Sequence, residues 1–318
     1  MDLLETCPGR KTFTLSTTDT AQHLPPAGEV TWRLDCAGET PFADLWRYFT
    51  ERVATEEVRS LVLGPWWHDD DYSDLRPALE RLLADADRFP ALRALFLADV
   101  SSEECEISWL MLTDITPVLE RFPLLEELGV RGGDSQGMGE EPLSLRPVRH
   151  EALRVLRFES GGLPAPVVRA VAASDLPALE RLDLWLGISH YGGDATVADL
   201  APLLTGGRLP ALRHLGLEDS EVQDEIAAAV ATAPVVAQLE SLSLAMGTLG
   251  DTGAEALLRG QPLTHLKRLD LHHHFLSDAM TARIRAALTP AGTEVDLSDR
   301  QRSLGRRSEE RRYVAVSE

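Results

Sequence analysis

The sequence predicts an α/β solenoid, a horseshoe of about eight to nine repeats with a concave parallel β-sheet and convex helices. Two observations lead to this prediction. A short leucine phrase recurs along most of the chain, and stretches with helical periodicity lie between its copies. One strand and one helix cannot bury enough apolar surface alone, so the repeats must stack to be stable.

The clearest copy of the phrase is Leu179-Glu-Arg-Leu182-Asp-Leu184. Leu182 and Leu184 have the spacing of two that places both side chains on one face of a short strand, so Arg181 and Asp183 must point to the other face. The first apolar residues of the copies lie 26 to 34 residues apart: Val58, Leu92, Leu125, Leu153, Leu179, Leu212, Leu239 and Leu266. A last, degenerate copy contains Val295 and Leu297.

The stretches between the phrases predict helices at residues 74–88, 164–173, 221–232, 251–259 and 277–288, several of which begin with Asp or Ser, as helix N-caps do. Stacked strands lie about 4.8 Å apart, whereas packed helices need about 8–10 Å. The array must therefore curve, with the sheet inside and the helices outside.

Three regions are expected along the chain. Residues 1–57 form an N-terminal cap, with strands at 11–15 and 30–35 and with Trp32 and Trp46 in its core. Residues 58–298 form the repeat array. Residues 299–318 are an arginine-rich tail, which either folds back across the array or stays solvated.

The charge balance favours some partners over others. The 318 residues carry 51 acids against 31 bases, a formal net charge of −20. Such a surface repels nucleic acid and anionic membranes and attracts basic partners, although acidity also serves solubility alone. The chain has no apolar run of about 20 residues and no apolar N-terminal stretch, and its three cysteines lack C-x-x-C spacing. These features favour a cytoplasmic protein without a membrane partner.

The recurring phrase resembles the leucine-rich-repeat family, and most closely its long-repeat, strand-plus-helix class typified by cytosolic ribonuclease inhibitor. The resemblance covers residues 58–298. One departure is that the chain contains no Asn, the residue that commonly follows the phrase and bonds the backbone there. The corresponding residues are Trp66, Val100, Gly133, Gly161, Gly187, Ser220, Gly247 and His274.

A narrower resemblance is carried by Glu106-Ile-Ser-Trp109, Leu145-Arg-Pro-Val-Arg-His-Glu151, His272-His-His-Phe-Leu-Ser277 and Arg312-Tyr-Val-Ala-Val-Ser-Glu318. These segments are similar to an uncharacterised bacterial leucine-rich-repeat family found beside radical-SAM-type enzymes. That resemblance implies an accessory or recognition role in a biosynthetic enzyme cluster and no known catalytic residues.

The concave face follows from the register of the phrase. Polar, charged and aromatic residues at the outward positions have no function in the core and are available to a partner. We therefore expect contacts from Phe96, Arg131, Arg157, Glu159, Asp183, Trp185, Glu218, Asp270 and His272.

The longer repeats add an aromatic rim. Their extra residues follow the strands at 65–73, 101–109 and 187–194, so in a parallel array they emerge on one edge. Aromatic residues on such loops often anchor partners, and we expect this of Trp66, Trp67, Trp109 and Tyr191. The alternative is that the tryptophans pack under the longer loops.

Metal-dependent chemistry is the competing interpretation. Strand alternation places Asp270, His272 and His274 on one side, where they could supply three ligands, and His68 with Asp69, Asp70 and Asp71 is a second cation candidate. Tetrahedral zinc sites, however, normally gather ligands from separated segments.

Catalytic motifs are lacking. The chain has no G-x-S-x-G, H-E-x-x-H or P-loop motif, and acidic neighbours disfavour the thiolate of Cys105. The sequence thus predicts no catalytic residue, cofactor or metal, and a non-enzymatic scaffold that binds a basic protein or peptide. The alternative is a metal-dependent hydrolase or metal-binding protein centred on His272–His274.

Overall fold

A computed structural model describes residues 10–18, 23–36, 40–67, 74–133, 142–303 and 311–317. Within them, eleven strands form one parallel sheet in which spatial order follows chain order. The strands are β1 (Lys11–Leu15), β2 (Val30–Leu34), β3 (Ser60–Leu63), β4 (Ala94–Leu97), β5 (Glu127–Arg131), β6 (Val155–Glu159), β7 (Arg181–Gly187), β8 (His214–Ser220), β9 (Ser241–Ser243), β10 (Arg268–Asp270) and β11 (Glu294–Asp296).

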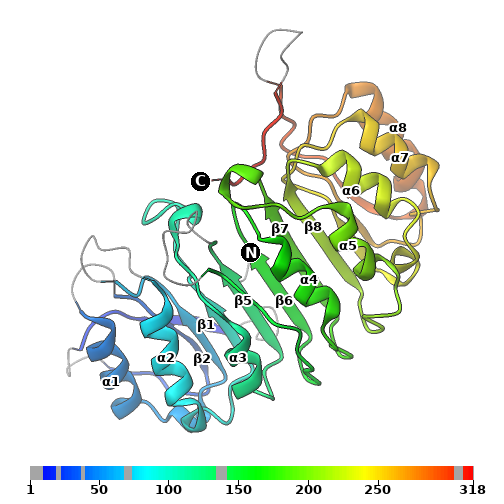
Figure 1. Cartoon of the computed structure of the whole chain (residues 1–318). Coiled ribbons are helices and arrows are strands. Elements are labelled where there is room, and N and C mark those ends of the chain that lie inside the picture. Colours follow the sequence, from blue (N-terminus) through cyan, green and yellow to red (C-terminus); the bar gives the residue numbers. More distant parts are fainter. Residues whose placement is uncertain are drawn as a thin grey trace.

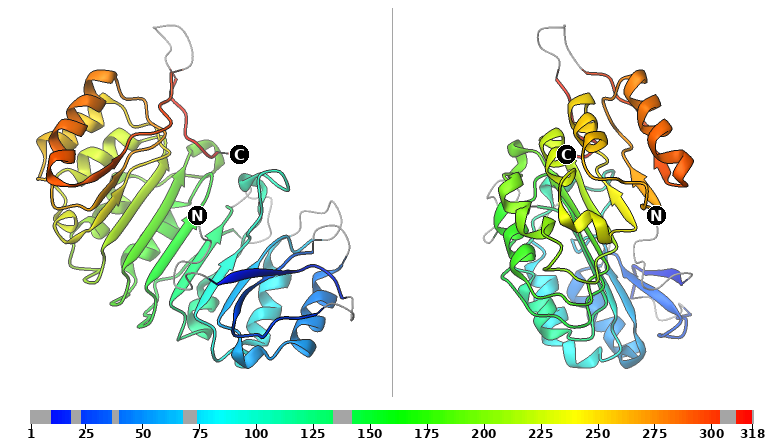
Figure 2. Two further views of the ribbon diagram at one scale, coloured as in Figure 1. Left: turned by 180° about the vertical axis from the view of Figure 1, so that it is seen from behind. Right: turned by 90° about the vertical axis from the view of Figure 1, so that its right-hand side faces the viewer.

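Helices cover one face of this sheet and leave the other open, as Figures 1 and 2 show. They are α1 (Phe42–Arg52), α2 (Arg76–Ala84), α3 (Thr116–Arg121), α4 (Ala165–Ala173), α5 (Val197–Leu204), α6 (Gln223–Val230), α7 (Asp251–Arg259) and α8 (Asp278–Leu288). The architecture is the predicted leucine-rich-repeat solenoid, with an open, curved parallel sheet. None of the described helices combines the length and apolar character needed to cross a bilayer.

The alternating leucines face inward as predicted. Leu182 and Leu184 are fully buried between the sheet and the helices, and so are Leu215 and Leu217 one repeat later. The anchor of each phrase is buried as well, from Val58 to Leu266. These side chains belong to one continuous hydrophobic core that runs the length of the array.

Strand pairing confirms the predicted register. Asp183 pairs with Arg157 on one side and with Gly216 on the other, and Gly216 pairs in turn with Ser243. Ser243 then pairs with Asp270. The outward residues that the sequence places in one column are therefore neighbours in space.

The sheet continues through the N-terminal region without interruption. Strands β1 and β2 lie where the sequence predicts them and pair in parallel with each other and with β3. Trp32 and Trp46 are buried in an aromatic group with Phe49, which confirms that they belong to the core.

Near the end of each of the last four strands, one residue adopts a left-handed conformation: Asp219, Met246, His273 and Asp299, with φ between 52° and 68°. Such a residue interrupts the alternation of side chains, so the next residue faces a different way. His274 is consequently fully buried, with Nε2 3.2 Å from the Leu297 carbonyl oxygen, and its Nδ1 accepts a hydrogen bond from Leu276 N–H. His274 thereby supplies side-chain bonds to the backbone at the position where the family commonly has Asn.

The C-terminal segment at residues 311–317 folds back on the array, one of the two alternatives that the sequence left open. Arg312 donates to Asp224 Oδ2 at 2.8 Å, and Ala315 N–H donates to the carbonyl oxygen of Met246 at 2.7 Å. Gly250 allows this approach, because a Cβ there would lie 2.3 Å from the Arg312 guanidinium. We name residues 311–317 the C-terminal strap (red in Figure 1).

Replacing Leu215 by Ala should lower the free energy of unfolding by about 2–5 kcal/mol, because the side chain is fully buried and leaves a cavity. The matched control is Leu124→Ala, since Leu124 is 52% exposed and its loss should change stability by less than about 0.5 kcal/mol. Urea denaturation of both variants measures the difference, and equal midpoints would contradict the assignment of the inner column.

Candidate functional site

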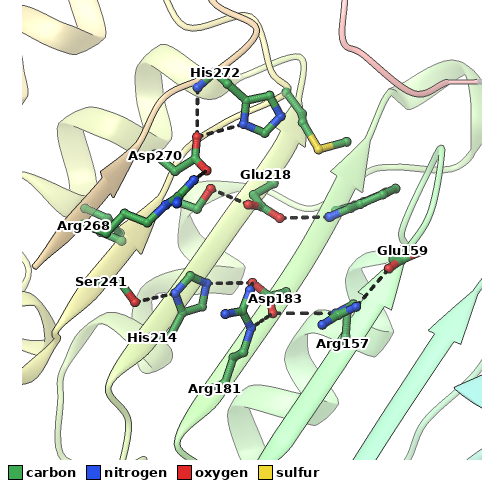
Figure 3. A pocket seen from close by; sticks show the side chains of 14 residues that line it. Arg157, Glu159, Arg181, Asp183, His214, Glu218, Ser241, Arg268, Asp270 and His272 are labelled. Carbon is green, nitrogen blue, oxygen red and sulfur yellow. Dashed lines mark hydrogen bonds and ion pairs between the residues drawn. The ribbon is translucent and has the colours of Figure 1, made fainter. Parts of the chain in front are cut away.

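A pocket of about 530 Å³ lies on the open face of the sheet, over β6 to β10 (Figure 3). Its walls are outward-facing side chains of five consecutive repeats. The lining residues are Arg157, Glu159, Arg181, Asp183, Trp185, His214, Glu218, Ser241, Leu242, Ser243, Met246, Arg268, Asp270 and His272. Among these, four carboxylates face three arginines, so the pocket is much closer to neutral than the whole chain.

Asp183 is the centre of the charged network. Arg181 Nε donates to its Oδ2 at 2.6 Å, and His214 Nε2 lies 2.8 Å from its Oδ1. Arg157 Nε lies 3.9 Å from Oδ2. The Asp183 side chain is only 3% exposed, so the two guanidinium groups compensate a carboxylate that is almost entirely removed from water.

The partners of Asp183 keep it ionised. Burial opposes the charged form, but the hydrogen bond with His214 and the positive charges of Arg181 and Arg157 outweigh it. The pKa of Asp183 therefore lies below its ordinary value. An ionised carboxylate only accepts hydrogen bonds, so Asp183 orients every donor around it.

A glycine gives Asp183 the room to reach these partners. Gly216 is its neighbour on β8, and a Cβ at that position would lie 2.5 Å from Asp183 Oδ1 and 3.2 Å from the Glu218 carboxyl carbon. Because Gly216 has no side chain, the Asp183 carboxylate can extend over β8 and reach His214. The other ring nitrogen of His214, Nδ1, lies 2.7 Å from Ser241 Oγ on β9.

Glu218 holds the side chain of Trp185 in place within the pocket. Its carboxylate accepts a hydrogen bond from Trp185 Nε1 at 2.9 Å and another from the Ser243 hydroxyl. Burial and the nearby negative charge of Asp183 raise the pKa of Glu218. The indole of Trp185 is thereby held in the pocket wall rather than left free.

Asp270 and His272 form a second acid–imidazole pair at the end of the pocket. His272 Nδ1 lies 2.8 Å from Asp270 Oδ1, and Arg268 donates to Asp270 Oδ2 at 2.9 Å. The hydrogen bond with Asp270 raises the pKa of His272, although burial acts against this. His272 is thus biased toward its charged form.

The structure brings seven of the predicted contact residues together in this pocket: Arg157, Glu159, Asp183, Trp185, Glu218, Asp270 and His272. Arg131 lies next to them, with its Nε donating to Glu159 at 2.7 Å. Trp67 and Tyr191 are half-buried outside the pocket, and Trp109 is 52% exposed.

Three of the pocket residues, Arg157, Glu159 and Asp183, are themselves at most 3% exposed, and two further predicted contact residues, Phe96 and Trp66, are buried outside the pocket. Phe96 was expected on the accessible concave face, but its ring lies over Gly129, which has no side chain to hold it away, and beneath the Arg131 guanidinium. Trp66 was expected on the rim, but it is only 5% exposed and packs edge-on against Trp67. For Trp66, the alternative of packing under the longer loop is correct.

The metal triad of the alternative interpretation does not form. Asp270 and His272 share the pocket, but the left-handed residue at His273 turns His274 into the core, where both of its ring nitrogens face backbone groups. No cluster of three or more His, Cys, Asp or Glu suited to a metal occurs in the part of the chain that the structure describes. His68 and Asp69–Asp71 lie outside the described residues.

The sequence analysis placed Arg181 on the outward face but left its column out of the expected contacts. Arg181, His214, Ser241 and Arg268 occupy equivalent positions on neighbouring strands, each two residues before the central outward position. The same alternation that identifies Asp183 also places Arg181 outward. Extending the register by one step toward the start of each strand would have found them.

The C-terminal strap lies beside the pocket. Met246 lines the pocket and accepts a hydrogen bond from the strap at Ala315, while fully buried Asp219 Oδ1 accepts one from Val316 N–H at 2.9 Å. Burial raises the pKa of Asp219 to about 8, although the hydrogen bonds from the strap oppose the shift.

The chain is similar to proteins of known structure. The chain aligns with the crystal structure of a protein from Bacteroides fragilis at 30% sequence identity, over 83% of this chain and 69% of that one, with a TM-score of 0.71. The two chains belong to one family. A crystal structure of TLR13 with ssRNA13 aligns at 13% identity over 93% of this chain and 36% of that one, with a TM-score of 0.41, too low to carry an argument. No family model and no curated protein matches the chain.

Replacing Asp183 by Asn should lower the free energy of unfolding by about 3–5 kcal/mol, because Arg157, Arg181 and His214 would lose their shared buried anion. Asp44→Asn breaks an exposed pair with Arg47 and should cost less than about 1 kcal/mol. Denaturant titration at neutral pH compares the two, and a similar loss in both would contradict the central position of Asp183.

Asp219 should make the free energy of unfolding fall with rising pH. The unfolded chain releases this proton near the ordinary value of 3.8, whereas the folded chain holds it up to about 8. Between these values the folded state binds more protons, so stability decreases as pH rises through that window. Asp219→Asn should remove this contribution. Denaturation from about pH 5 to pH 8 tests it, and identical slopes in both proteins would refute it.

Proposed function

We propose that the protein is a binding scaffold that holds a basic segment of a partner protein or peptide in the concave pocket and against the rim beside it. The observation that carries the proposal is the C-terminal strap. A segment with consecutive arginines at its start already lies extended along this rim, where carboxylates and carbonyl oxygens hold it.

The strap supports a basic partner through specific contacts. The Arg312 guanidinium donates to Asp224 and to the carbonyl oxygen of Thr248, at 2.8 and 3.0 Å. The Tyr313 ring packs edge-on against His273 and Phe275, with centroid distances of 5.6 and 5.3 Å. Charge, aromatic contact and backbone hydrogen bonds are the interactions by which scaffolds bind extended peptides.

The pocket offers a partner the same chemistry on a larger scale. Trp185 and Met246 supply apolar surface, and Glu218 and Asp270 supply carboxylates. Trp185, Glu218 and Asp270 stand on strands of the sheet, so little conformational entropy is lost when a ligand binds. The net charge of −20 adds long-range attraction for a cationic partner.

The narrower sequence resemblance extends this proposal to an accessory role beside a biosynthetic enzyme. The family assignment and the solenoid fold are compatible with such a role. The ribonuclease-inhibitor-like class points the same way, since its arrays present a curved sheet to a partner. The metal-dependent alternative receives no support, because His274 faces the core.

Affinity selection from a random heptapeptide library on the immobilised protein should enrich sequences rich in Arg and Lys. Trp185→Ala should weaken the selected peptides about 30-fold, because losing an aromatic anchor costs about 2 kcal/mol. The matched control is Leu124→Ala, which removes an exposed apolar side chain outside both the pocket and the predicted rim and should leave affinity unchanged.

Calorimetric titration of a selected peptide gives these affinities, which should also fall as salt is raised. A selection without cationic enrichment would refute the basic partner. Equal losses in Trp185→Ala and Leu124→Ala would refute the pocket as its site.

A further inference from the structure

Three side chains of the pocket form a hydrogen-bonded relay that ends on a hydroxyl. Asp183, His214 and Ser241 lie on neighbouring strands β7, β8 and β9, one repeat apart in each step (Figure 3). Asp183 Oδ1 lies 2.8 Å from His214 Nε2, and His214 Nδ1 lies 2.7 Å from Ser241 Oγ. A carboxylate, an imidazole and a hydroxyl in this order are the components of an activated serine nucleophile.

The ionisation of Asp183 determines which ring nitrogen carries the proton. An ionised carboxylate can only accept, so in neutral His214 the proton resides on Nε2 and points at Asp183. The lone pair of Nδ1 then faces Ser241 and accepts its hydroxyl proton. The two nitrogens exchange the roles they have in chymotrypsin-like enzymes, but either nitrogen of an imidazole can act as the base.

The relay is held in place from both sides. Arg181 donates to both oxygens of Asp183, from Nε to Oδ2 at 2.6 Å and from Nη2 to Oδ1 at 3.3 Å, and so fixes the carboxylate that contacts His214 through Oδ1. Gly216 provides the space across which that contact forms. A base held in one orientation removes the reorganisation that would otherwise precede proton transfer.

Ser241 lines the pocket together with Arg268. Arg268 pairs with Ser241 in the strand register and lines the same pocket, and its side chain is 45% exposed. Its guanidinium pairs with Asp270, Glu294 and Asp296, at 2.9, 3.1 and 3.3 Å. The pocket volume of about 530 Å³ leaves room for an acyl group above Ser241.

We propose that Ser241 is a nucleophile for acyl transfer from an ester, with His214 as its general base and Asp183 as the residue that positions His214. Ser241 Oγ bonds to the carbonyl carbon while its proton passes to His214 Nδ1. The bond from that carbon to the alkoxide breaks, and the leaving alkoxide takes the proton from Nδ1. Water then attacks the acyl-serine by the same relay, releases the carboxylic acid and restores the Ser241 hydroxyl.

This activity goes beyond binding, and it departs from the expectation that the chain is not an enzyme. Sequence motifs did not indicate it, because its residues are separated by whole repeats rather than joined in one loop. Selection of peptides by the pocket and acylation of Ser241 are separate measurements, so either can fail without the other.

A fluorophosphonate probe tests the nucleophile directly, since it bonds to an activated serine oxygen with loss of fluoride. Mass spectrometry of the intact wild-type chain should show one adduct, and peptide mapping should place it on Ser241. Ser241→Ala should abolish labelling, and His214→Gln should slow it about 100-fold or more, because the base is lost. Ser298→Ala, an exposed serine outside the pocket, should label like wild type.

Absence of an adduct on the wild-type protein, or an adduct on another residue, would overturn the proposal without any variant. A labelling rate that does not change in folded His214→Gln, as judged by circular dichroism, would overturn the role of the base. Hydrolysis of p-nitrophenyl acetate should follow the same pattern across the variants.

The positioning role of Asp183 has its own readout. Nitrogen-15 spectra of the histidine rings should show His214 with a protonated Nε2 and an unprotonated Nδ1 at neutral pH. The contact of Asp183 with Nε2 imposes this tautomer, so the spectrum tests whether Nδ1 is free to act as the base. Observation of the proton on Nδ1 would refute the relay, because that nitrogen could not then accept the proton of Ser241.

Discussion

The in-register packing of two apolar side chains per strand is the constraint on which the whole molecule depends. Leu182 and Leu184 face the helices, and their counterparts on each neighbouring strand do the same. A shift of one residue would exchange the buried and exposed faces of a strand. Because the hydrophobic core forbids this shift, the residues between the leucines are fixed in columns on the open face.

These columns explain how the open face tolerates buried charge. Asp183 meets cations from its own strand and from one neighbour, Arg181 and Arg157, and the imidazole of His214 from the other. Glu159 is compensated in the same way by Arg131 and Arg157. The chain is strongly acidic, yet its pocket is nearly neutral, so most of the excess negative charge lies elsewhere on the molecule.

The leucine pattern made the fold, the register and the strand positions predictable from the sequence. The reason is that the two-residue spacing of the leucines directly determines which side chains of a strand are buried. Side-chain accessibility was less predictable. Phe96 is buried because Gly129 and Arg131 happen to flank it, and His274 is buried because a left-handed residue precedes it. Both outcomes depend on neighbours about 30 residues away or on a backbone angle, which hydrophobic periodicity does not report. His214 and Ser241 were missed for a simpler reason: only two outward positions per strand were read.

Because the relay spans three repeats, its two hydrogen bonds bridge the gaps between separate strands. The distance across each gap follows from how tightly the horseshoe is bent at that point. Flattening or tightening the arc around β8 would lengthen or shorten both contacts together. The distance between Ser241 Oγ and His214 Nδ1 therefore depends on the local curvature of the solenoid. A bound molecule that changes this curvature changes how readily His214 accepts the proton of Ser241.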